Sequence, residues 1–399
     1  MRTDYIGLRV ARWRDLAGMT QQQLADAVGV SRPYISMIEN GDRAVTKRDL
    51  LLKLAQAIGV SVNDLTAQPY EPASREELAL YLAAPRIRLA LDGADEVVTP
   101  RSLKRLAADT EAAMVARMAC DYPTLGDLLP ALIAETHLLA ESADNERTER
   151  AALALVVKAY VTASLAVKPN GFVDLGVRLA ERAERAATKL GDPVYQAATQ
   201  FALSQAILAS GSRRRSLNLA ATAADAIQPH VDSPDGKTWY GMLHLHAALV
   251  SASLGGHADA ASHLAEAEET AAYASGNPWM MEFSPANVGV WRVAVALENG
   301  EPQRAPEYAR AVDHTALRTV QRRAHLLVNT ARGQFIAGKH DDAVRSLLAA
   351  DDIAPAEIRS RPAVLEIVGQ MVRDSRQRGG SEELRQLATR LHIDPLAEV

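Results

Sequence analysis

The segment Ser31–Glu39 (SRPYISMIE) carries side chains that can hydrogen-bond nucleic acid. An arginine near the start of a helix can make two hydrogen bonds to guanine in the major groove of DNA, so Arg32 is the first candidate for base readout. Tyr34, Ser36 and Met37 are expected to face outward with it, where they can contact bases, thymine methyl groups or phosphate. This chemistry requires an exposed helix that is held by a small apolar core.

The residues before this segment predict a first short helix. Thr20 can cap that helix, and Gln23, three residues later, completes a capping box. Leu24 and Val28 are four residues apart and share one helix face. Gly29 is expected to end the helix, because glycine adopts the left-handed conformation without a Cβ penalty.

A second helix is predicted directly after a turn of about three residues. Ser31 caps it, and Pro33 falls in its first turn, where a missing N–H breaks no intrahelical bond. Ile35 and Ile38 point back towards the core. Two helices joined in this way form a helix-turn-helix arrangement.

The pattern resembles the λ-repressor-like (XRE) helix-turn-helix family over about residues 4–66. The matching residues are Gln21, Leu24, Ala25, Val28, Gly29, Val30, Ser31, Ile35, Ile38 and the ENG at Glu39–Gly41. Flanking helices are expected at Arg9–Ala17, at Asp49–Ile58 and, capped by Ser61, within Gly59–Leu65. The resemblance implies a five-helix domain whose recognition helix lies in the major groove. It also implies a structural pair between Arg14 and Glu39.

The resemblance extends the expected DNA contacts beyond the recognition helix. It implies that Gln21 binds a phosphate, and Arg43 and Lys47 in the following loop can hold the DNA backbone. For Lys47, an ordinary solvated charge is the alternative reading, and small helix-turn-helix folds also serve in protein contacts. The full predicted set is Gln21, Ser31, Arg32, Tyr34, Ser36, Met37, Arg43 and Lys47.

Composition predicts an all-α protein of more than one domain. The chain has 399 residues, few aromatics and a net charge of −5. Residues 1–70 carry nine Lys/Arg against seven Asp/Glu, so the basic side lies with the predicted DNA-binding segment. The expected organisation is a helix-turn-helix domain at 1–66, a linker at 67–75, a helical connecting region at 76–146 and a repeat domain at 147–399.

The repeat is marked by glycines that recur every 38 to 45 residues, at Gly211, Gly255, Gly300, Gly338 and Gly379, with Gly171 extending the series backwards. A second helix follows each glycine, as in GGHADAASHLAEA and GKHDDAVRSLLAA. This periodicity is typical of an α-solenoid built from helix pairs. The units resemble tetratricopeptide repeats (TPR), although HEAT-like packing stays open.

Polar residues recur nine and thirteen positions before four of these glycines, on one face of the first helix of each pair. We call these positions the polar stripe; it comprises Met242, His246, Asn287, Trp291, His325, Asn329, Glu366 and Gln370. If the stripe lines a groove, its side-chain amides can pair with a peptide backbone. The expected effector-binding residues are His246, Asn287, Trp291, His325 and Asn329. Simple exposure, or histidines that satisfy nearby backbone groups, is the alternative.

No enzyme motif is found, and no metal site or cofactor is expected. A single cysteine, Cys120, permits no internal disulfide and no cysteine-based zinc site, which fits a reducing cytoplasm. The charged N-terminus does not fit a signal peptide, and we find no apolar run of about 18 residues that would span a membrane.

The expected function is a cytoplasmic, homodimeric transcription regulator that binds a double-stranded operator through the N-terminal domain. Its TPR-like domain would bind a peptide or small-molecule effector. The two modules are similar in layout to peptide-pheromone receptors of Gram-positive bacteria, and the residue usage resembles that of actinobacterial regulators. The alternatives make the repeats a protein-docking scaffold, or a dimerisation module with no ligand.

Overall fold

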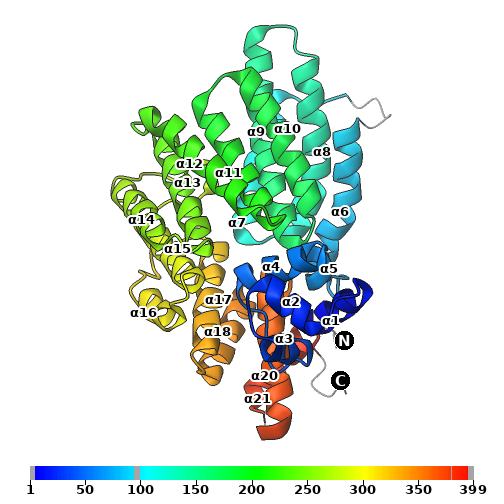
Figure 1. Ribbon diagram of the computed structural model, residues 1–399. Coiled ribbons are helices and arrows are strands. Elements are labelled where there is room, and N and C mark those ends of the chain that lie inside the picture. The colour runs from blue at the N-terminus through cyan, green and yellow to red at the C-terminus, as the bar shows by residue number, and fades with distance from the viewer. Residues whose placement is uncertain (1–4, 94–98, 379, 394–399) are drawn as a thin grey trace. The chain divides into compact units, whose positions relative to one another are not determined.

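The computed structural model describes residues 5–93, 99–378 and 380–393, and every regular element within them is a helix (Figure 1). The prediction of an all-α fold is confirmed. The chain divides into two compact units. The first comprises Met1–Gln68, Arg292–Asp313 and Arg323–Val399, and the second comprises Pro69–Trp291 and His314–Arg322.

The first unit begins with five short helices: α1 (Ile6–Leu16), α2 (Gln21–Val28), α3 (Arg32–Glu39), α4 (Arg48–Ile58) and α5 (Val62–Thr66). Thr20 and Gln23 form the expected capping box on α2. Ser31 caps α3 by accepting a hydrogen bond from the Tyr34 N–H at 3.3 Å. Gly29 ends α2 in the left-handed conformation, with φ 80°. The caps and the turn thus form where the local sequence predicts them.

The apolar positions of these helices make one buried core. Leu24, Ile35 and Ile38 are fully buried in it, together with residues from all five helices. The close contact of α1 with α3 depends on Gly7, a residue that the sequence analysis did not single out. A Cβ atom on Gly7 would lie 1.8 Å from the carbonyl oxygen of Ile38, so only glycine fits there.

The remaining helices begin with a three-helix segment, which helix pairs follow. That segment contains α6 (Arg75–Asp92), α7 (Leu103–Ala119) and α8 (Tyr122–Glu141). The second unit continues with α9 (Glu146–Val167), α10 (Val173–Leu190), α11 (Pro193–Ala209), α12 (Arg213–Ile227), α13 (Pro234–Ser253) and α14 (His257–Ala272). The later helices are α15 (Pro285–Glu298), α16 (Ala305–Arg310), α17 (Val320–Ile336), α18 (His340–Ile353), α19 (Pro355–Arg359), α20 (Pro362–Arg378) and α21 (Glu382–Arg390).

Four 3₁₀ turns complete the described elements: η1 (Lys168–Asn170), η2 (Gln228–His230), η3 (Pro278–Met280) and η4 (Pro302–Arg304). Helices α15 and α17 contribute residues to both units, so this division does not follow the boundaries expected from sequence, which stay a prediction.

The glycines of the predicted repeat separate the two helices of each pair. Gly171, Gly211, Gly255, Gly300 and Gly338 all have positive φ, between 76° and 103°. The expected Gly379 lies outside the described residues. Within the second unit, α11 packs against both α9 and α13, so the first helices of successive pairs are neighbours. This stacking is the expected geometry of a helical solenoid.

One segment, Glu146–Asn170, is long and apolar enough to cross a membrane by length and composition. This segment was not expected from the sequence, because its charged residues interrupt any continuous apolar run. In the structure, 72% of its most apolar window is buried. It packs against α7, α8, α10 and α11, as a core helix of the second unit does.

Candidate functional site

Helix α3 presents its polar side to solvent while its apolar side is buried. Arg32 is exposed at the first position of the helix, and Met37 is 39% exposed one and a half turns later. Tyr34 and Ser36 are half-buried beside them. Ser31 is exposed as the N-cap, so the first turn of α3 offers both backbone N–H groups and side-chain donors to a ligand in front of it.

The loop after α3 brings two of the predicted DNA-binding residues together. The guanidinium of Arg43 lies 4.9 Å from the centroid of the Tyr34 ring. The Arg43 N–H donates to the Met37 carbonyl at 3.1 Å, which holds the loop against the end of α3. Lys47 is exposed at the N-cap of α4. These cations lie in the loop that joins α3 to α4, where a phosphate contact was expected.

The pair that the family resemblance implied, Arg14 with Glu39, is present and buried. Arg14 Nε donates to Glu39 Oε1 at 2.6 Å and Arg14 Nη2 donates to Oε2 at 3.0 Å. The hydrogen bond to Glu39 is the main reason that the pKa of Arg14 is raised. Gln21, which was expected on a phosphate, donates its amide to Glu39 Oε2 at 2.8 Å. In the free protein Gln21 therefore completes the Arg14–Glu39 network at the start of α2.

Within the second unit, the polar stripe is buried. His246 and Asn287 are fully buried, and Trp291 is 9% exposed. His246 Nε2 lies 2.9 Å from Ser216 Oγ, as expected of a histidine that satisfies its neighbours. Asn287 Nδ2 contacts the Met242 sulfur at 3.9 Å. Because these two residues occupy the same stripe position in successive repeats, the alignment of the repeats is correct here.

Two polar atoms of this part of the stripe have no partner among the described residues. They are Asn287 Oδ1 and Trp291 Nε1, both buried from solvent. A buried acceptor or donor without a hydrogen bond costs free energy, and such groups are uncommon in native proteins. These atoms mark the place in the stripe where an additional polar group would be most stabilising.

In the first unit, the stripe contacts the helix-turn-helix segment. Asn329 Oδ1 accepts a hydrogen bond from Arg332 Nη1 at 3.3 Å, and Arg332 Nη2 donates to the Thr46 carbonyl at 3.0 Å. Burial is the main cause of a lowered pKa for Arg332, which also lies 3.6 Å from Glu298. His325 pairs instead with Glu357, at 3.1 Å.

The last two stripe residues, on α20, bind backbone groups of the first helix and of the loop after α3 directly. Glu366 Oε1 accepts from the Ile6 N–H at 2.6 Å, which satisfies an orphan donor in the first turn of α1. Gln370 Oε1 accepts from the Ala44 N–H at 2.6 Å, and Gln370 Nε2 donates to the Asp42 carbonyl at 3.0 Å. Burial raises the pKa of Glu366.

Arg373, one turn further along α20, is a contact residue that the sequence analysis missed. Its Nε donates to the Gly41 carbonyl at 3.1 Å, and its guanidinium lies 4.2 Å from the Tyr5 ring centroid. The four-residue and three-residue spacing of Glu366, Gln370 and Arg373 on one helix face was the available signal. We call Arg332, Glu366, Gln370 and Arg373 the docking residues, because each binds the backbone of Ile6 or of the loop Gly41–Thr46.

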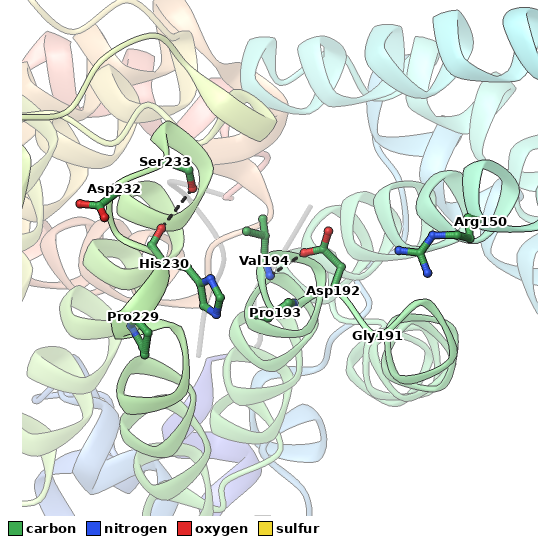
Figure 2. A pocket seen from close by; sticks show the side chains of 9 residues that line it. All are labelled: Arg150, Gly191, Asp192, Pro193, Val194, Pro229, His230, Asp232 and Ser233. Atoms are coloured by element: carbon green, nitrogen blue, oxygen red, sulfur yellow. Dashed lines mark hydrogen bonds between the residues drawn. The ribbon is translucent and has the colours of Figure 1, made fainter. Parts of the chain in front are cut away.

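An open cleft of about 540 Å³ lies in the second unit, away from the predicted site residues. Figure 2 shows it at the N-terminal ends of α11 and α13, with Arg150, Asp192 and His230 around it. Asp192 Oδ1 already caps α11 through the Val194 N–H at 2.9 Å, and Arg150 donates to the Leu190 carbonyl at 3.0 Å. The side chains of Asp192 and Arg150 are thus already hydrogen-bonded to backbone groups at helix ends.

Comparison with known proteins identifies the N-terminal segment. Residues 10–65 match the family model described as helix-turn-helix. The propionyl-CoA carboxylase regulator of Cereibacter sphaeroides is 37% identical to this chain over 67 residues, which are 17% of this chain and 14% of that relative. The chain therefore matches about a seventh of the length of that relative.

Two solved structures align with most of the chain at low similarity. Bacillus thuringiensis PlcR in complex with the peptide PapR7 and DNA is 13% identical, over 89% of this chain and 96% of that chain, with a TM-score of 0.28. ComR from Streptococcus suis is 13% identical, over 95% of this chain and 97% of that chain, with a TM-score of 0.26. Scores this low do not establish a common fold.

Proposed function

We propose, from the helix-turn-helix domain that residues 10–65 of this chain form, that the protein is a sequence-specific DNA-binding transcription regulator. The observation that carries the proposal is the geometry of α3. Its apolar residues are buried in the domain core, its N-terminus is capped, and its side with Arg32 and Met37 faces solvent. A helix presented in this way fits the major groove with its first turn at the base edges.

The docking residues support a link between the repeats and the DNA-binding domain. They bind the backbone on both sides of Arg43, which is expected to contact the DNA backbone. A change in the position of α20 or α17 would therefore move the loop after the recognition helix. An effector that favours one such position changes DNA affinity by the difference in its own affinity for the two states.

A homodimer is part of the proposal, because one recognition helix contacts few base pairs. Two copies would bind half-sites separated by about 34 Å, one turn of B-DNA, or a multiple of it. Such a regulator works in the cytoplasm, where its DNA is.

An effector in the second unit is supported by the unpaired Asn287 Oδ1 and Trp291 Nε1, whose hydrogen-bonding capacity a peptide or small molecule can use. The proposed effector-binding residues of this unit are His246, Asn287 and Trp291, and those of the first unit are His325 and Asn329. The alternative, in which the repeats serve dimerisation or protein docking without a small ligand, is favoured by one observation. The stripe residues of the second unit are already buried by the chain itself.

Fluorescence anisotropy on the DNA upstream of the protein's own gene tests the proposal. At fixed salt, the protein is titrated with and without a small-molecule extract of the source cells. Specific binding supports the regulator, and a shift with extract supports the effector. Binding no tighter than to unrelated DNA would contradict sequence-specific recognition, and specific binding that never shifts would favour the alternative.

A further inference from the structure

We propose that Trp279 occupies a binding pocket for a planar aromatic ligand with an N–H donor, such as an indole. The segment Asn277–Phe283 connects α14 to α15 and reaches across three earlier repeats of the second unit. Trp279 lies with its ring 5.1 Å from Tyr195 on α11 and 5.2 Å from Trp239 on α13, edge-on to both. The ammonium of Lys158, on α9, lies 5.1 Å from its ring centroid.

The pocket recognises the indole through three different interactions. The Trp279 Nε1–H donates to Asp235 Oδ1 at 2.7 Å, a charge-assisted hydrogen bond. Lys158 adds a cation–π contact, and the two edge-on rings add aromatic packing. Lys158, Tyr195 and Trp239 lie on α9, α11 and α13, the first helices of three successive helix pairs. The pocket therefore lies on the face that the stacked repeats share.

The backbone that carries Trp279 is held in an unfavourable conformation. Trp279, Met280 and Glu282 have φ values of 55°, 52° and 52°, in the left-handed region that side chains other than glycine seldom adopt. Such conformations persist where surrounding contacts impose them, and they concentrate at ligand sites and switches. Release of Trp279 from the pocket would let this backbone relax.

The segment Asn277–Phe283 is anchored at its C-terminal end by Glu282 and Phe283. The Glu282 carboxylate accepts from the Arg318 N–H at 2.5 Å and from the Thr319 N–H at 3.1 Å. The ring of Phe283 packs on Gly241, where a Cβ atom would lie 1.9 Å from it. Trp279 can therefore leave while residues 282–283 stay bound.

The pocket reaches solvent along one side. Lys158, Tyr195 and Asp235 are each partly exposed, whereas Trp279 is only 7% exposed. The cleft of Figure 2 lies at the beginnings of the same two helices, α11 and α13, but other residues line it. A ligand that enters along the partly exposed side chains would compete with Trp279. In addition, the buried Trp239 Nε1–H has no partner among the described residues and is available to a ligand acceptor.

This inference rests on the proposed function only in that a ligand in the pocket would act as the effector. It is tested without DNA, so its failure is distinguishable from a failure of DNA binding. In full-length Trp279→Ala protein, isothermal titration with indole should give a Kd at least tenfold lower than for the wild type. 1-Methylindole, which lacks the N–H, should bind about tenfold more weakly than indole. The matched control, Tyr273→Ala, removes an exposed aromatic residue at the C-cap of α14 and should leave indole affinity unchanged.

Hydrogen–deuterium exchange of the wild-type protein provides the second measurement, which does not depend on a variant. Saturating indole should raise exchange in peptides that contain residues 278–281 and leave α9 protected. A folded Trp279→Ala protein that does not bind indole would overturn the proposal. So would unchanged exchange at 278–281 under saturating indole, even if the variant fails to fold.

Discussion

At the scale of single residues, the helix-turn-helix domain separates residues that hold it from residues that can read DNA. Gln21 was expected on a phosphate, yet in the free protein its amide bonds to Glu39. Arg32 is instead exposed at the first turn of α3. The two residues therefore make different predictions when each is removed.

Arg32→Ala should weaken specific DNA binding by about 1–3 kcal/mol and relax the sequence preference, because a bidentate contact to a base edge is lost. Anisotropy titrations on the operator and on single-base variants measure both effects. The matched control is Arg12→Ala, which removes an exposed arginine from α1 and should change binding little. Unchanged affinity and preference in Arg32→Ala would remove this residue as a base reader.

Glu39→Ala should destabilise the helix-turn-helix domain by about 3–5 kcal/mol, because it removes the buried partner of Arg14 and leaves this charge only the exposed Asp15. Chemical denaturation followed by circular dichroism measures the loss. Lys53→Ala serves as control: it breaks the exposed pair with Asp49 at 2.9 Å and should cost at most about 1 kcal/mol. Equal effects of the two substitutions would contradict a structural role for the buried pair.

At the scale of elements, the two helices of a pair contact each other in α9–α10, α11–α12 and α13–α14. In the pair α13 and α14, His244 Nδ1 and His263 Nδ1 lie 2.9 Å apart, so one nitrogen donates and the other accepts. Burial, followed by the neighbouring His263, lowers the pKa of His244 to about 4, while Glu266 and Asp225 oppose the shift. Burial also lowers the pKa of His263.

This histidine pair predicts that the second unit loses stability in mild acid. The pKa of His244 lies below its ordinary value of 6.5, so the unfolded chain binds the proton more tightly. The neutral His244 contributes on the order of 1–3 kcal/mol to the free energy of unfolding. This contribution is complete above pH 6.5 and is lost as the pH falls towards 4. Thermal unfolding between pH 7 and 4 measures it. His244→Gln should reduce the dependence of the unfolding temperature on pH, whereas substitution of an exposed histidine, His314→Gln, should not. An equal pH dependence in the wild type and both variants would show that the histidine pair does not cause the loss of stability.

Helix α20 contacts the loop after α3, which is distant from it in the chain, and this contact can be tested directly. Gln370→Ala should increase hydrogen exchange at the Ala44 amide, whose acceptor it removes, by about tenfold or more. Exchange in α9 should stay unchanged. Glu383→Ala, on the exposed side of α21, is the control. Protection of Ala44 that equals the wild type would show that this amide is held by something other than the stripe.

At the scale of the whole molecule, the polar stripe has two structural environments. In the second unit it is buried, with unpaired atoms on Asn287 and Trp291. In the first unit Asn329 positions Arg332, and Gln370 binds the loop after the recognition helix directly. One periodic feature of the sequence thus supports both parts of the proposed regulator, ligand response and control of the DNA-binding domain.

The double variant Asn287→Ala with Asn329→Ala should abolish an effector response while DNA binding itself persists, because neither side chain lies on the predicted DNA-contacting face. Anisotropy with and without the cell extract measures both properties. Ala198→Ser with Ala202→Ser, at the equivalent positions of an earlier repeat, is the control for changes on this face. A normal response in the asparagine variant would exclude the stripe as the effector site.

The sequence by itself determined the features that depend on neighbours a few residues away. The capping box of Thr20 and Gln23, the left-handed Gly29 and the glycines between repeat helices all form where they were expected, because each satisfies backbone groups or φ requirements within one turn. The buried apolar positions of α2 and α3 follow from helical periodicity for the same reason.

Only the tertiary structure decided which surfaces meet. Ala44 and Gln370 are 326 residues apart, and nothing local to either predicts that the amide of one binds the side chain of the other. The same holds for Trp279, which carries no helical pattern and reaches its pocket only because three stacked repeats bring Lys158, Tyr195 and Asp235 together. Periodicity specifies the face on which a side chain lies, but its partner depends on how distant helices pack.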